Sequence, residues 1–539
     1  MKSKLKKIIS KSIGVNPNDF SVEVPVNKNF GDYSTNIAMV LKKNPNEIVE
    51  KIKSNLFKKI EVKNGFINFF LEDKVFLDEI KKIDKNFGKN SELKNKKIII
   101  DYTDPNPFKE FHIGHLMSNS IGESISRIFE FQGAKVKRVC YQGDVGIHVA
   151  KAIWGKLHDK NLQWGQAYVF GAKMYEDDEN AKREIIELNK KIYNRSDKEV
   201  NKLYDQGKKE SLKHFDEIYK KLDTHFDYFI FESETGPLGK KIIEKGLKKG
   251  IFEKGDNNTI IFKGEKYGLH TRVFVNSDGL PTYEAKDLAL AEIKYKKYKY
   301  DKSIVITASE QNDYFKVMLC AMSQINKKLA DKTEHIGHGM LRLPEGKMSS
   351  RTGKVITGES LINQVENLVK QKIKDRDLTE KEKIEISQKV AVGALRYSVL
   401  KQKIGSDIIY DFDKSISFEG DSGPYLQYSY TRARSILKKA KEQGIKPSFK
   451  NLPNTISQLE KTMIYFPDII LQASKKYEPH YILLYLTELA GEFNSYYAKN
   501  KIIDKDEKFS PYKIALTSVF VQIMKNGMWL LGIQTLEKM

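Results

Sequence analysis

The sequence predicts a Rossmann-like α/β domain between a small N-terminal α+β domain and a C-terminal all-α bundle. Three observations support the α/β prediction: a β-branched run at 97–102, a helical run that follows it, and a second apolar run at 137–141. A strand, a helix and a strand in this order form a βαβ unit of a doubly wound parallel sheet. The 539 residues leave room for about three or four domains of roughly 100–200 residues each.

The N-terminal domain is expected to span residues 1–92. It opens with a basic amphipathic helix, continues through a loop at 27–33 and contains a strand-like run at 65–70. The charged stretch from Lys81 to Lys97 is interpreted as a linker or a solvated helix.

The α/β domain is expected to span residues 93–383. After the first strand, a turn containing two prolines leads into a helix from about residue 115 to Phe131, and Gln132-Gly133 supplies a C-cap signal. Short apolar runs at 303–307 and near 334–336 fit further strands of the same sheet. Residues from about 155 to 250 are polar and helical in pattern, so we interpret them as a helical insertion.

The all-α bundle is expected to span residues 384–539. Helical periodicity with lysine-rich faces is clear at 424–440, 481–499 and 513–534. No strand signal interrupts it, and the chain shows no internal repeat.

The composition narrows the function classes. Lys and Arg number 93 against 71 Asp and Glu, a net charge of +22. That excess fits either a polyanionic partner such as nucleic acid or a solvated lysine-rich surface, and composition alone leaves both open. Apolar runs of about 18 residues are absent, so we expect no membrane span. Without a signal-peptide pattern, and with two cysteines too few for a disulfide framework or a four-cysteine zinc site, a cytoplasmic location is expected.

The first motif, His112-Ile113-Gly114-His115, opens the helix after the first strand. A helix N-terminus attracts anions through its free N–H groups and its dipole. Two imidazoles three residues apart can both donate hydrogen bonds to phosphate oxygens. Taken alone, the four residues also fit a surface histidine pair or a metal-binding pair.

The second motif, Lys347-Met348-Ser349-Ser350-Arg351, is predicted to lie in a loop. Lys347 offers a point charge for pyrophosphate, and the two serines offer donors. A basic surface loop is the plain alternative. A second copy of the first motif, at 335–338, lies only twelve residues before the start of the loop motif. We interpret that copy as a strand leading into the loop, with no catalytic role.

Together the two motifs resemble the HIGH and KMSSR signatures of class I aminoacyl-tRNA synthetases. Residues 101–106 and 143–146 narrow the resemblance to arginyl-tRNA synthetases, and it covers nearly the whole chain. Residues 30–36 and 65–69 resemble that family's N-terminal additional domain, which contacts the tRNA elbow. Residues 394–397 and 423–428 are similar to its anticodon-binding bundle, and 531–539 resemble its terminus.

The resemblance implies an arginine–tRNA ligase. Arginine and ATP would give arginyl-adenylate and pyrophosphate, and the arginyl group would then move to the terminal adenosine of tRNA(Arg). The implied partners are tRNA(Arg), L-arginine and ATP with Mg²⁺, and the implied state is a monomer. The lysine excess would then line a tRNA-binding face, and binding would weaken steeply with salt. A class I synthetase for another amino acid, a non-catalytic tRNA-binding paralogue and a nucleotidylyltransferase remain as alternatives.

The resemblance also implies site residues. A guanidinium needs carboxylates and an aromatic face, and Tyr283 and Asp287 lie at i and i+4, on one helical face. Val145 and His148 depart from the family's usual Trp and Gln. The implied roles are catalysis by His112, His115, Lys347 and Lys109; ATP binding by Gly114, Ser349 and Ser350 with His112, His115 and Lys347; arginine binding by Asn106, Glu232, Tyr283, Asp287 and Gln311; and tRNA binding by Tyr33, Asn36, Tyr425, Tyr428 and Met539. No metal-ligating residue is expected.

Overall fold

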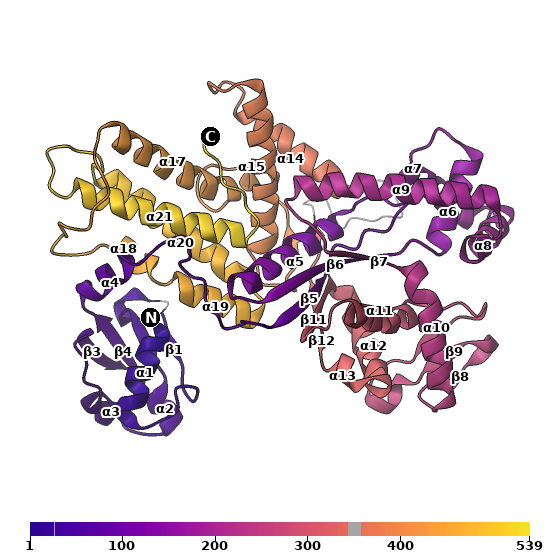
Figure 1. The fold of residues 1–539 in the computed structure, drawn as a ribbon, viewed down its shortest axis with the longest axis horizontal. Helices are drawn as coiled ribbons and strands as arrows, with labels where there is room; N and C mark the ends of the chain where they lie inside the picture. Colours follow the sequence, from indigo (N-terminus) through magenta and orange to yellow (C-terminus); the bar gives the residue numbers. More distant parts are fainter. Residues whose placement is uncertain (26, 343–356) are drawn as a thin grey trace.

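The computed structural model describes residues 1–25, 27–342 and 357–539. Figure 1 shows an elongated molecule with the α/β domain in its middle, the helical bundle and the N-terminal domain toward one end, and the helical insertion toward the other. The central sheet has five parallel strands in the order β12-β11-β5-β6-β7. This arrangement confirms the predicted fold class.

The N-terminal domain is a four-stranded antiparallel sheet with four short helices. The predicted first helix and the strand after residue 65 are both present, and the segment from 81 to 96 contains no helix, so it is a linker. The elements of the N-terminal domain are α1 (Lys2–Ile13), β1 (Val22–Glu23), η1 (Lys28–Phe30), β2 (Tyr33–Thr35), α2 (Ile37–Leu41), α3 (Pro45–Lys51), β3 (Phe57–Lys63), β4 (Phe66–Leu71) and α4 (Asp73–Ile80).

The α/β domain contains the predicted βαβ unit, β5-α5-β6. Its elements are β5 (Lys97–Asp101), α5 (Ile113–Phe131), β6 (Lys135–Gln142), α6 (Ile147–His158), α7 (Trp164–Asp177), α8 (Glu179–Asn194), α9 (Lys198–Lys221), β7 (Tyr228–Phe231), α10 (Glu232–Lys248), β8 (Glu253–Lys254), η2 (Asp256–Asn258), β9 (Ile260–Phe262), η3 (Gly264–Tyr267), β10 (Arg272–Val275), α11 (Tyr283–Lys297), β11 (Lys302–Ala308), η4 (Ser309–Gln311), α12 (Asn312–Ile325), α13 (Lys327–Ala330), β12 (Thr333–His338), β13 (Leu341–Arg342) and α14 (Gly358–Lys372).

The bundle contains the three predicted long helices, which are α17, α20 and α21. Its elements are α15 (Glu380–Leu400), β14 (Ile408–Ile409), α16 (Phe412–Ser415), α17 (Gly423–Glu442), α18 (Gln458–Met463), α19 (Phe466–Lys476), α20 (His480–Lys499) and α21 (Ser510–Leu530). The two-residue strand β14, which pairs with β13, was not predicted. Among the described helices, none is long and apolar enough to cross a membrane.

The segment predicted as a purely helical insertion contains one strand of the central sheet. Strand β7 pairs with β6 as the edge strand, so the inserted helices α6–α9 end before it. The strand was missed because it is only four residues long and follows a long polar helix. A small antiparallel sheet, β8–β10, follows α10 and was also not predicted.

Helix α5 links the central sheet to the bundle. It packs against both β strands of its βαβ unit and against α15 and α21, and nearly all of its residues are buried. Gly122 allows the close approach of Tyr102, because a Cβ there would lie 2.3 Å from the Tyr102 ring. Tyr102 donates to Glu123 over 2.7 Å. Burial alone would raise the pKa of Glu123, but Arg138 and Arg127 lower it to about 2.

The N-terminal domain is fastened to the bundle by two buried carboxylates. Asp468 of α19 accepts a hydrogen bond from the Tyr33 hydroxyl over 3.2 Å. In the other direction, Asp32 pairs with Lys461 of α18 at 2.9 Å. Tyr465 adds an edge-to-face contact with the Tyr33 ring. These contacts fix the position of the N-terminal domain beside the bundle.

Replacing Tyr33 with phenylalanine should therefore weaken this interface. Loss of one buried hydrogen bond is expected to lower the free energy of unfolding by about 1–2 kcal/mol. Urea unfolding followed by circular dichroism would measure it. The matched control is Tyr497→Phe on α20, an exposed tyrosine, and an equal effect of both substitutions would contradict the assignment.

Candidate active site

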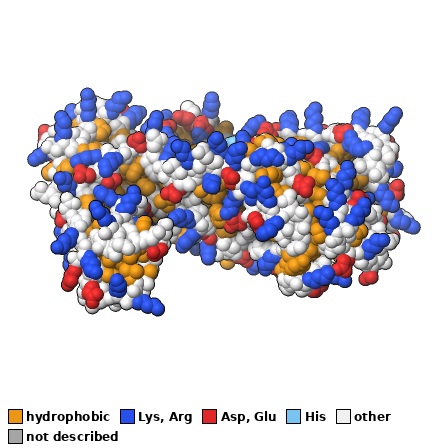
Figure 2. All heavy atoms as spheres, turned by 60° about the horizontal axis from the view of Figure 1, so that its bottom comes forward, with side chains coloured by type: hydrophobic (Ala, Val, Ile, Leu, Met, Phe, Trp, Pro, Cys, Tyr) orange, Lys and Arg blue, Asp and Glu red, His pale blue; other side chains and the backbone are white. Residues whose placement is uncertain are grey.

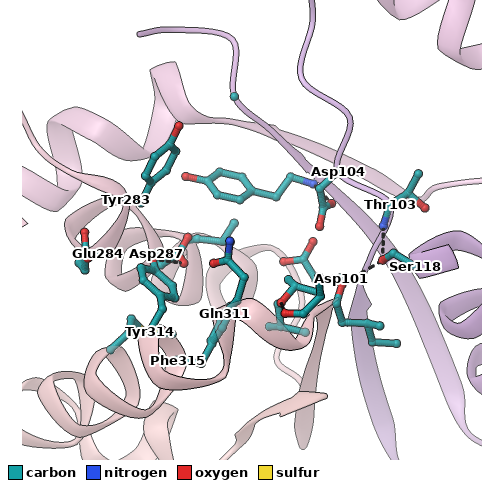
Figure 3. A pocket seen from close by; sticks show the side chains of 18 of the residues that line it. Asp101, Thr103, Asp104, Ser118, Tyr283, Glu284, Asp287, Gln311, Tyr314 and Phe315 are labelled. Atoms are coloured by element: carbon teal, nitrogen blue, oxygen red, sulfur yellow. Dashed lines mark hydrogen bonds between the residues drawn. The ribbon is translucent and has the colours of Figure 1, made fainter. Parts of the chain in front are cut away.

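The loop between β5 and α5 carries unusual backbone geometry. Thr103, Asp104 and Phe108 have φ angles of 82°, 48° and 70°. Two hydrogen bonds hold the loop. Thr103 N–H donates to Ser118 Oγ over 3.0 Å (Figure 3), and Tyr141 N–H donates to Asp104 Oδ1 over 2.7 Å. Positive φ at non-glycine residues costs about 1–3 kcal/mol each and concentrates at functional sites. The positive φ angles therefore indicate that this loop belongs to a functional site.

The two histidines of the first motif lie at the N-terminus of α5. The backbone N–H of His112 donates to Nδ1 of His115 over 3.1 Å, so the neutral His115 ring carries its proton on Nε2. The rings stack with centroids 3.4 Å apart. A Cβ at Gly114 would lie 3.0 Å from the His112 ring, so glycine lets this ring fold over the first turn.

Both imidazoles are neutral near pH 7. Burial and the charge of Lys109 lower the pKa of His112 to about 4. Burial, His112 and Lys109 lower the pKa of His115 well below its usual value. Neutral rings at a helix N-terminus present N–H donors to an anion without adding charges that must be desolvated.

A cavity of about 620 Å³ opens at the carboxyl ends of the central strands. In an open parallel sheet this edge is where ligands bind. Figure 3 shows residues from α11, η4 and the end of β5 pointing into one space. Eight predicted residues line the cavity together: Asn106, His112, Gly114, His115, Glu232, Tyr283, Asp287 and Gln311.

Two acids from neighbouring helices lie in the wall of the cavity. Asp287 accepts from the Tyr314 hydroxyl over 2.6 Å. Burial raises the pKa of Asp287 to about 7, although Tyr314 and Lys294 oppose the rise. Glu232 pairs with Lys286 at 2.5 Å. Burial nevertheless keeps the pKa of Glu232 above its usual value.

Asn106 and Gly143 close another side of the cavity. Asn106 Oδ1 accepts from the Gly143 N–H over 2.8 Å, and a Cβ at Gly143 would lie 2.7 Å from that oxygen. His148 holds the Gly143 carbonyl from behind, with Nε2 at 2.9 Å. Val145 is buried in the core of the insertion. Neither departure from the family pattern therefore lines the cavity.

Of the two lysines predicted to bind phosphates, the structure describes Lys109. Lys109 does not line the cavity, and its Nζ lies 4.9 Å from the ring centroid of Tyr168 on α7. Burial lowers the pKa of Lys109. Lys347, Ser349 and Ser350 lie outside the described residues.

The second copy of the first motif forms strand β12, as predicted. Its backbone pairs with β11 throughout, so it offers no free helix N-terminus. His335 stacks on Phe315 with centroids 3.9 Å apart, and His338 lines the cavity. A histidine that the prediction set aside therefore faces the site.

Sequence reasoning missed a buried polar network below the two acids. Lys294 pairs with Asp101 at 2.9 Å, and both side chains are almost fully buried. Burial and the neighbouring Asp101 raise the pKa of Asp104 well above its usual value. Lys294 lies seven residues after Asp287 on the same face of α11, so helical spacing could have identified it. In the part of the chain described, no group of three His, Cys, Asp or Glu side chains could hold a metal ion.

The residues predicted to contact tRNA differ from one another in how far they are buried. Tyr33 is 0% exposed, because it packs between the N-terminal domain and the bundle, so its side chain is not available to tRNA; this corrects the prediction. Asn36 is half-buried and accepts from the Ser21 N–H. Tyr425 and Tyr428, both on α17, are half-buried and accept from Asn494 and Arg432, and Met539 packs at the edge of the core. Tyr430 is buried.

The basic residues are widely distributed. Figure 2 shows Lys and Arg side chains over the whole face drawn, with acidic side chains among them. No single basic stripe stands out on that face. The N-terminal domain does expose apolar side chains, since Phe66 is 41% exposed and Met39 and Val40 are also exposed.

The chain is similar over its whole length to proteins of one kind. Residues 1–71 match the family described as arginyl tRNA synthetase N terminal domain, 78–412 match tRNA synthetases class I (R), catalytic domain, and 426–539 match DALR anticodon binding domain. Arginine–tRNA ligases of Fusobacterium nucleatum and Clostridium kluyveri are 33% and 31% identical, each over 96% of this chain and 95% and 96% of theirs. Among solved structures, the arginyl-tRNA synthetase of Thermus thermophilus superposes with a TM-score of 0.77 at 21% identity, covering 100% of both chains. That of Plasmodium falciparum superposes with a TM-score of 0.79 at 23% identity, covering 100% of this chain and 99% of the other.

Proposed function

Since the chain belongs to the arginyl-tRNA synthetase family, we propose how its residues divide that family's reaction. The reaction joins arginine to tRNA at the expense of ATP. The observation that carries the proposal is the cavity, where one set of side chains suits a phosphate and another suits a guanidinium.

His112 and His115 serve the α-phosphate during formation of arginyl-adenylate. Their neutral N–H groups donate to oxygens on which negative charge increases in the transition state. Lys347 and Lys109 hold the leaving pyrophosphate, as the family resemblance implies. Catalysis is then mostly positioning and charge stabilisation, and it needs no covalent enzyme intermediate.

Asp287, Glu232 and Tyr283 bind the guanidinium of arginine. The two acids offer the carboxylate oxygens that a guanidinium fork prefers, and the Tyr283 ring, 56% exposed at the start of α11, can cover it. Asn106 and Gln311 bind the α-amino and carboxylate ends. An uncharged analogue would lack the positive charge that balances the two buried acids, so discrimination should be strong.

ATP is the nucleotide, with Gly114, Ser349 and Ser350 contributing to its site. Mg²⁺ would accompany the nucleotide and would be held mainly by its phosphates and by water. In the described ranges no group of three His, Cys, Asp or Glu side chains could hold a metal ion, which fits an ion that arrives with the nucleotide. The ion would neutralise phosphate charge when bound.

The bundle and the N-terminal domain bind tRNA(Arg). Tyr425 and Tyr428, both half-buried, stack on unpaired anticodon bases, and Met539 also contacts the tRNA. In the N-terminal domain, exposed Phe66 replaces Tyr33 as the side chain best suited to contact the elbow. The enzyme acts as a monomer in the cytoplasm.

The discriminating experiment is tRNA-dependent ATP–pyrophosphate exchange with each amino acid in turn. Exchange with arginine alone is the expected result. Exchange with another amino acid would overturn the specificity, and no exchange at all would favour a non-catalytic paralogue.

The affinity for arginine should depend on pH through Asp287. A guanidinium binds the ionised carboxylate, and burial raises the pKa of this carboxyl to about 7. The KM for arginine is therefore expected to be about tenfold higher at pH 6 than at pH 8, with most of the rise below pH 7. Aminoacylation assays between pH 6 and 8 would measure it, and a constant KM over that interval would contradict the prediction.

A further inference from the structure

A buried cation stands beside the two acids of the cavity. Nζ of Lys286, in the first turns of α11, lies 2.5 Å from Oε2 of Glu232 at the start of α10, and the side chains are 6% and 5% exposed. The same Nζ lies 3.4 Å from the Tyr193 hydroxyl of α8 and 5.3 Å from the centroid of the Tyr283 ring. Lys286 does not line the cavity, whereas Glu232 does. The lysine therefore holds Glu232 from behind.

Each acid keeps one oxygen for a ligand. Lys286 occupies Oε2 of Glu232, and the Tyr314 hydroxyl occupies Oδ2 of Asp287. Within the described ranges, no hydrogen bond reaches Oε1 of Glu232 or Oδ1 of Asp287. A guanidinium has several N–H donors in one plane, so it can serve two such oxygens at once.

We propose that Lys286 is a positioning residue that sets the charge of the arginine pocket. It neutralises Glu232, so Glu232, Asp287 and Lys286 together carry one net negative charge when both acids are ionised. One guanidinium balances that charge. The inference rests on the proposed function, because it takes Glu232 and Asp287 to be the acids that bind arginine.

The surroundings of Glu232 explain why the lysine is needed. The acids Asp144 and Asp287 and the tyrosines Tyr141, Tyr193 and Tyr283 lie near it, and Lys109 is the other nearby cation. Asp144 is already paired with Lys208 at 2.8 Å. A buried carboxylate that loses its partner is strongly disfavoured and takes up a proton instead. Without Lys286, Glu232 would therefore be neutral until a guanidinium displaced that proton.

The substitution Lys286→Met tests this by counting protons. In the unchanged enzyme, arginine binding below pH 7 displaces one proton, from Asp287. In the variant it should displace two, so the limiting slope of log KM for arginine against pH, reached as the pH falls below the pKa values of the acids, steepens from about −1 to about −2. Lys286→Arg keeps the charge and should keep the slope near −1. Tyr193→Phe, which removes only the hydroxyl contact, should do the same.

Three further results decide the matter. A folded Lys286→Met enzyme with an unchanged slope would overturn the inference, whatever its kcat. If that variant fails to fold, the double variant Glu232→Gln/Lys286→Met removes both charges and should restore folding with a slope near −1; failure to restore it would also overturn the inference. If Glu232→Gln leaves the KM for arginine unchanged, the proposed function of Glu232 fails instead.

Discussion

Replacing Asp287 with alanine is expected to raise the KM for arginine by about 10²–10³-fold, a loss of about 3–4 kcal/mol, while tRNA affinity stays unchanged. In the proposed arginine pocket, the substitution removes one of the two carboxylates that would face the guanidinium. Asp287 is itself buried with a raised pKa, so removing it relieves a desolvation cost and should leave the fold intact. The measurements are tRNA-dependent aminoacylation kinetics and a separate tRNA binding titration.

Two matched variants sharpen this test. Asp287→Asn keeps the shape and the hydrogen bond from Tyr314 but removes the charge, so it should lose nearly as much arginine affinity. Glu292→Ala removes a carboxylate from the same helix outside the cavity and should change little. Parallel losses of arginine and tRNA affinity in the Asp287 variants would indicate misfolding and not a lost contact.

Local patterns were enough to predict the centre of the fold. The strand at 97–101 and the helix after His112 follow from a β-branched run and a capped apolar helix, which are short-range signals. The cavity residues could be named because the resemblance supplied their order, and parallel strands bring their carboxyl ends to one edge. Residues whose positions depend on the local sequence pattern and the strand order of a single domain could therefore be predicted.

Residues whose positions depend on contacts between segments far apart in the sequence could not be predicted. Tyr33 falls in a loop predicted from the sequence, yet its hydroxyl donates a hydrogen bond to Asp468, 435 positions away. Lys286 looks like a surface lysine in a helix, yet it pairs with Glu232 across 54 positions. Periodicity carries no information about such pairings, because they depend on how whole elements dock.

The repeated His-Ile-Gly-His sequence shows the same limit. At 112–115 it lies at the N-terminus of helix α5, whereas at 335–338 its backbone pairs with the neighbouring strand β11. Backbone context decides which copy can bind an anion. The Pro-Asn turn before the first copy and the helical run after it were the local signs of the difference.

Replacing His115 with alanine should lower kcat by about 10²–10³-fold, or about 2.7–4 kcal/mol, with little change in the KM for ATP. Its Nε2–H is fixed as a donor because Nδ1 accepts from the His112 N–H, so the imidazole serves charge that develops only in the transition state. Removing it also frees the His112 ring from its stack, which adds to the loss. His335→Ala is the matched control, since that ring belongs to the repeated motif but does not line the cavity. Equal effects of the two substitutions on single-turnover adenylate formation would remove His115 from the mechanism.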